Sequence, residues 1–131
     1  MPRKSSVGIR SAFGPIARVR AEHERPMRDL LARLPQLNAD ARGRLDFLNC
    51  SPSLLLEVAE HAETCVEAIN LGISAIGNLI PMAAPEIEDG TISAGTVESL
   101  GWLICELSDF SAACFVLASE CRQSRAATND S

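Results

Sequence analysis

The five cysteines of this 131-residue chain form no CxxC pair, and an odd number cannot pair completely. The spacing therefore argues against a disulfide framework and against a zinc site of the usual kind. Three of the cysteines fall in apolar stretches. There we expect them to pack as small hydrophobic residues.

The sequence also lacks a run of eighteen uninterrupted apolar residues. Its N-terminus, MPRKSSVGIRSAFGPIARVR, has neither the apolar core nor the small-residue cleavage site of a secretory signal. We therefore expect a cytoplasmic protein without a membrane segment.

Lysine and arginine are scarce after residue 44. Residues 1–44 hold ten of the twelve Lys and Arg and four acids, a net charge of 10 − 4 = +6, whereas residues 45–131 have 2 − 13 = −11. A basic N-terminal segment followed by an acidic remainder permits nucleic-acid binding through residues 3–28. It equally permits contact between the N-terminal arm of one subunit and the acidic remainder of another. Arg18 and Arg20 are our candidate partner contacts in this arm.

Signals of an enzyme are few. Neither of the two histidines lies in a local arrangement with Ser or Cys that would indicate a catalytic nucleophile pair. The chain also has no glycine-rich phosphate loop and no ExxH spacing. The sequence therefore favours a protein that is not an enzyme and needs no cofactor.

The composition, 47% hydrophobic and 22% charged, is that of one soluble globular domain. We expect a flexible basic arm over residues 1–22, a single α-helical domain over 23–124 and a frayed tail over 125–131.

Two short helices are predicted before the main body. The first begins at Pro26 and stops at Pro35, with Met27, Leu30 and Leu31 at helical spacing. A second, capped by Asn38 or Asp40, is expected to close near Asn49.

A long helix is predicted from Ser51-Pro52 to Ile80, followed by Pro81. Its apolar residues alternate steps of four and three, which indicates a heptad seam that packs along its length against a second long helix. The seam residues are Leu55, Ala59, Ala62, Val66, Ile69, Ile73, Ile76 and Ile80.

The second long helix is predicted to start at a Ser93 or Thr96 cap, after a loop over residues 81–92, and to end near Arg122. Its seam contains Val97, Leu100, Ile104, Leu107, Cys114, Ala118 and Cys121. A second apolar face lies opposite, formed by Trp102, Cys105, Ala112, Ala113 and Val116.

These patterns predict an all-α fold: a long antiparallel helical hairpin with short N-terminal helices. Because a lone hairpin cannot cover the second apolar face, we expect a homodimer in which two hairpins form a four-helix bundle. Trp102 and Val116 are the predicted dimer contacts. The alternative is a monomer in which segments 26–34 and 40–49 cover them.

Acidic residues recur at i, i+3 on both long helices. In EVAEHAETC, residues 57–65, most of the polar side chains point away from the seam and are interpreted as a solvated face. Glu57 and Glu60, followed by Glu106 and Asp109 in ICELSDF, resemble the magnesium site of the all-α nucleoside triphosphate pyrophosphohydrolases, the MazG-like and dimeric dUTPase-like family. The resemblance implies that these four carboxylates bind Mg²⁺, which would bridge phosphate oxygens.

The sequence thus favours a small, non-enzymatic α-helical protein that binds an unidentified macromolecular partner. The alternatives are the magnesium-dependent pyrophosphohydrolase and nucleic-acid binding through the arm.

Overall fold

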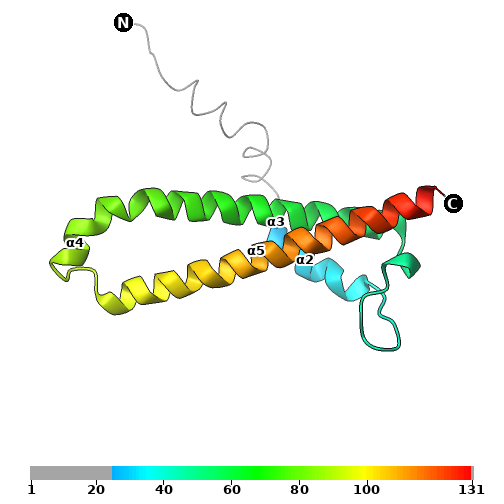
Figure 1. Cartoon of the computed structure of the whole chain (residues 1–131), viewed down its shortest axis with the longest axis horizontal. Helices are drawn as coiled ribbons and strands as arrows, with labels where there is room; N and C mark the ends of the chain where they lie inside the picture. Colours follow the sequence, from blue (N-terminus) through cyan, green and yellow to red (C-terminus); the bar gives the residue numbers. More distant parts are fainter. Residues whose placement is uncertain (1–24, 131) are drawn as a thin grey trace, which may run out of the picture.

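The computed structural model describes residues 25–130, and this part of the chain is all-α, as predicted. Helices α3 (Pro52–Leu79) and α5 (Ala94–Asn129) run antiparallel as a long hairpin. The shorter α2 (Pro26–Arg33) lies against one end of it (Figure 1). The described residues contain no strand, only an isolated bridge between Ala39 and Leu45.

Helix α2 has the predicted limits. Pro26 occupies its first position, and the Asp29 carboxylate accepts a hydrogen bond of 3.3 Å from the backbone N–H of Arg25. Because Pro35 has no N–H to continue the helix, the chain passes into a 3₁₀ turn at Leu34–Gln36.

The second short helix that we expected after residue 38 does not form, so that prediction is wrong. Asp40 instead holds a turn, because its carboxylate accepts hydrogen bonds from the backbone N–H groups of Arg42 at 2.8 Å and Arg44 at 2.9 Å. Such local side-chain bonds compete with helix formation, and Gly43 in this turn has a φ of 74°. Only a 3₁₀ turn at Phe47–Asn49 follows.

The long helices start at the predicted caps. Ser51 Oγ accepts a hydrogen bond from Leu54 N at 3.2 Å, and Ser93 Oγ accepts one from Thr96 N at 3.1 Å. Helix α5 continues to Asn129, well past the Arg122 at which we expected it to end.

The connection between the long helices is more helical than the predicted loop. It consists of a 3₁₀ turn at Pro81–Ala83 and the short α4 (Ala84–Glu88). Both prolines lie in the first turn of these elements, where the missing N–H has no intrahelical acceptor to lose. This cap joins α3 to α5 at the far end of the hairpin (Figure 1).

The buried core fills only one end of the hairpin, which we call the base: α2, the loop to residue 51, residues 52–69 and residues 111–129. Apolar residues of α2, α3 and α5 meet there. Cys65, Cys114 and Cys121 are among them and pack as the small hydrophobic residues that we predicted. The contiguous buried cluster consists of Leu30, Leu37, Leu55, Val58, Ala59, Ala62, Cys65, Cys114, Ala118 and Cys121. Ile69 is buried as well.

Candidate interaction surface on the distal hairpin

Burial stops abruptly beyond the base. No residue between 70 and 110, the segment we call the distal hairpin, is buried, although the heptad seam continues through both of its helices. The seam residues Ile73, Ile76, Leu100, Ile104 and Leu107 are only half-buried. Two helices alone therefore leave the distal seam partly open to solvent.

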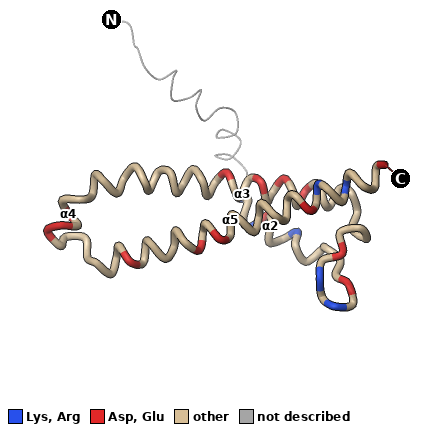
Figure 2. Tube along the Cα trace, in the orientation of Figure 1, with Lys and Arg blue, Asp and Glu red and all other residues tan. Residues whose placement is uncertain are grey.

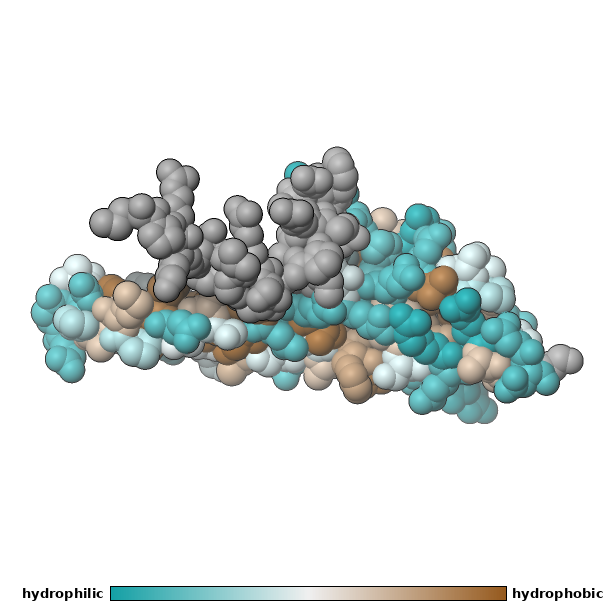
Figure 3. All heavy atoms as spheres, turned by 90° about the horizontal axis from the view of Figure 1, so that it is seen from above, coloured by the Kyte–Doolittle hydropathy of each residue, from teal (hydrophilic) through white to brown (hydrophobic). Residues whose placement is uncertain are grey.

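Large hydrophobic side chains surround this open seam. Between the hydrophilic base and tip, Figure 3 shows hydrophobic residues on the surface of the hairpin. Contiguous exposed apolar patches on monomers rarely exceed a few hundred Å², and larger ones mark interaction sites. The exposed large residues of the distal hairpin are Leu71, Leu79, Ile80, Met82, Val97, Trp102 and Leu103.

An apolar groove lies between the long helices near the tip. Its volume is about 360 Å³. At Gly101, no side chain or distant backbone lies within 4 Å of the place that a Cβ would occupy, so the groove is open there. Side chains from both helices line it, including Ile76, Leu79 and Ile80 from α3 and Val97, Leu100 and Ile104 from α5.

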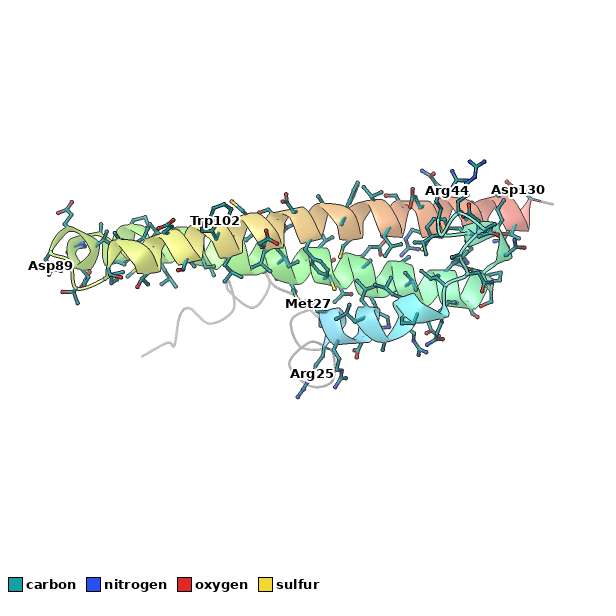
Figure 4. The ribbon with its side chains drawn as sticks, turned by 90° about the horizontal axis from the view of Figure 1, so that it is seen from below. Arg25, Met27, Arg44, Asp89, Trp102 and Asp130 are labelled. Carbon is teal, nitrogen blue, oxygen red and sulfur yellow. The ribbon has the colours of Figure 1, made fainter. Side chains whose placement is uncertain are left out.

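Both predicted dimer contacts are exposed on α5. Trp102 is 66% exposed and Val116 is 54% exposed. Figure 4 shows Trp102 on the opposite side of the hairpin from Met27 and Arg25 of the α2 region. The alternative in which the N-terminal helices cover Trp102 and Val116 is therefore wrong, because α2 packs Leu30 into the base instead.

Basic residues lie at one end of the described molecule, whereas acidic residues lie along its whole length (Figure 2). The distal hairpin carries six acids and no Lys, Arg or His, a net charge of −6. The seven arginines among the described residues lie in the base or, for Arg25, directly before it, together with nine acids, so this end has a net charge of 7 − 9 = −2. Arg18 and Arg20 fall outside the described residues.

The four carboxylates of the magnesium hypothesis do not meet within one chain. Glu57 forms an ion pair with Arg33, with Oε2 at 2.8 Å from Nε, and Glu60, Glu106 and Asp109 are exposed. Among the described residues, no three His, Cys, Asp or Glu side chains form a group that could hold a metal ion.

The antiparallel register explains this separation. Cys65 and Cys114 interact across the helix pair in the base. Glu60 lies five residues before Cys65, toward the start of α3 in the base. Asp109 lies five residues before Cys114, toward the tip. At 1.5 Å per residue, these two acids are roughly 15 Å apart along the hairpin, and the other cross-helix pairs are farther apart.

The acidic stretch EVAEHAETC supplies two ion pairs that link α3 to its neighbours in the base, from Glu57 to Arg33 of α2 and from Glu63 to Arg122 of α5. Glu63 accepts hydrogen bonds from Arg122 Nε at 2.5 Å and from Nη2 at 2.7 Å. These bonds lower the pKa of Glu63 below its ordinary value. Sequence reasoning missed the partners Arg33 and Arg122, because both ion pairs join segments that only the tertiary structure brings together.

By length and composition, the helical segments Pro52–Glu88 and Ala94–Asn129 are also apolar enough to cross a membrane, a test that mostly buried core helices of soluble proteins pass as well. Here only 11% of each apolar window is buried. Glu98, Glu106 and Asp109 lie on the distal part of α5 and are exposed. Each acid placed at the centre of a bilayer costs about 3 kcal/mol or more. Residues 68–85 of the other candidate span carry no charged side chain.

No family model, curated protein or solved structure matches this chain.

Proposed function

We propose that this protein is a non-enzymatic α-helical interaction protein that acts as a homodimer. The open face of the hairpin, centred on the distal hairpin, is its self-association surface, and the α2 side of the base with the basic N-terminal arm is presented to a macromolecular partner. One observation carries the proposal: both heptad seams run the full length of the hairpin, but burial ends at Ile69 on α3 and at Ser111 on α5.

A second copy of the chain suits this surface because its own heptad seam is equally exposed over the distal hairpin. Two hairpins packed face to face form a four-helix bundle, in which the half-buried seam residues become core. The whole hairpin face, roughly 20 Å wide and about 40 Å long over the 28 residues of α3, offers on the order of 800 Å², the area that each partner contributes to a standard stable interface. The contact must therefore extend from the distal hairpin along the exposed face of the base.

Sedimentation of the full chain over a range of concentrations tests the proposal. The test variant is Leu79→Glu, which puts a charge on the 61% exposed Leu79 at the groove. Its matched control is Leu48→Glu, at a residue of the base that is 72% exposed. We expect a wild-type dimer, a dissociation constant at least tenfold higher for Leu79→Glu, and no change for Leu48→Glu.

A wild-type protein that remains monomeric at high concentration would overturn the proposal. The proposal would also be overturned if the protein binds lipid vesicles in a flotation assay instead of dimerising, and if Leu79→Glu abolishes that vesicle binding.

A further inference from the structure

Phe115 is an exposed aromatic residue on the same face of α5 as the groove. It is 65% exposed, although it lies beside the base core. From Val97 in the groove to Phe115 is 115 − 97 = 18 residues, which is five turns of helix, so both side chains point in one direction about 27 Å apart. An exposed phenylalanine and an apolar groove thus share one face.

The strip of α5 between these two residues carries no charge. Gly101, Ile104, Ser108 and Ala112 lie along it. The acids Glu98, Glu106 and Asp109 lie four or seven residues from Trp102 and therefore share a different face with it. A contact over the Phe115 face would bury apolar and small residues and leave the acids at its rim, which is the usual anatomy of an interface.

We propose that two copies pack antiparallel about a two-fold axis near Ser108, with Phe115 of each copy inserted into the groove of the other. The inference rests on the proposed dimer and adds its anchor and its orientation. A two-fold interface is self-complementary, so the single Phe115 and the single groove of the chain make two identical contacts.

The register of this arrangement places Phe115 opposite Gly101 of the second copy. Phe115 lies seven residues beyond Ser108, and seven residues before Ser108 is Gly101. Because Gly101 has no side chain and open space beside it, a ring from the partner can enter the groove there. Trp102 and Val116, on the neighbouring face, then lie toward the rim of the contact.

The ends of the molecule are complementary in the same register. Arg125 lies seventeen residues beyond Ser108, and seventeen residues before Ser108 is Thr91, next to Asp89. Arg125 lines a small hollow at the end of α5 beside Arg122, which already pairs with Glu63 of its own chain, whereas Glu86, Glu88 and Asp89 crowd the tip. Figure 4 shows Asp89 and Asp130 at opposite ends of the hairpin. A parallel dimer would instead place the two acidic tips side by side.

Two variants test the anchor by sedimentation of the full chain. Phe115→Ala removes the ring, and Gly101→Leu fills the groove from the open space at Gly101 without disturbing the packing of the base. Burying one phenylalanine corresponds to about a tenfold gain in affinity, so losing both contacts should weaken the dimer about a hundredfold. Trp102→Ala is the control, with a change below about threefold expected for a rim residue.

A wild-type dimer that Phe115→Ala and Gly101→Leu leave unchanged would overturn the inference and leave the proposed homodimer standing. A monomeric wild-type protein would overturn both. A larger effect of Trp102→Ala than of Phe115→Ala would move the interface to the other face of α5 and also overturn the inference.

Reversing the charges at the tip and at the end of α5 tests whether the two copies are antiparallel. In the antiparallel dimer, Asp89→Lys and Arg125→Glu should each weaken association, and combining them in one chain should restore much of it, because the two sites then attract again. In a parallel dimer, Asp89→Lys would relieve repulsion between adjacent tips. A tighter dimer for that single variant would overturn the antiparallel arrangement.

Discussion

Leucines 30 and 31 are neighbours on α2, yet they have opposite environments. Leu30 is 1% exposed in the base core, and Leu31 is 61% exposed. Replacing each with alanine makes the same chemical change in the same helix. The difference in the free energy of unfolding between Leu30→Ala and Leu31→Ala therefore isolates the contribution of packing.

The magnitude follows from the burial of Leu30. Removing its side chain loses about 1.5–3 kcal/mol of transfer free energy, and a cavity term is added to this. The exposed ion pair between Arg33 and Glu57 contributes no more than about 1 kcal/mol, so it cannot hold α2 in place of Leu30. We expect Leu30→Ala to lower the free energy of unfolding by about 3 kcal/mol, and Leu31→Ala by less than about 0.5 kcal/mol.

Urea unfolding followed by far-ultraviolet circular dichroism measures both values. All samples must have one protein concentration, because dimerisation links apparent stability to concentration. Equal stabilities of the two variants would refute the placement of α2 on the hairpin, and with it the three-helix core of the base.

Three further outcomes are expected. Because Arg122 lowers the pKa of Glu63, the ion pair stabilises the fold above the unfolded value near 4.5 and is lost as pH falls through the lower folded value. Urea unfolding of Glu63→Gln should thus show a loss below about 1 kcal/mol at neutral pH, and a deficit that persists in strong acid would contradict the pairing. Burial raises the pKa of Cys65 to about 12 and that of Cys121 to about 11, so mass spectrometry should find iodoacetamide on exposed Cys105 first and on these two only after unfolding. Finally, the purified protein with Mg²⁺ should release no pyrophosphate from nucleoside triphosphates, and release that disappears in Glu106→Gln would show that Glu106 takes part in catalysis.

Local sequence signals determined much of the helical framework. Pro26, Ser51-Pro52 and Ser93 set the starts of α2, α3 and α5, because caps and first-turn prolines act within a few residues. The prediction failed where local signals conflicted. Asp40 can cap a helix or close a turn, and the turn formed because Gly43 and the Asp40 side chain favour it together.

The heptad repeats alone establish that two long apolar helices pair, since a heptad repeat defines a face whatever lies opposite it. Where that face is covered depends on tertiary contacts. Leu30 and Leu37 close the core at the base, whereas the same repeat remains open from residue 70 to residue 110. Whether a seam position is buried depends on the third element packed against it, and α2 is too short to reach the distal hairpin.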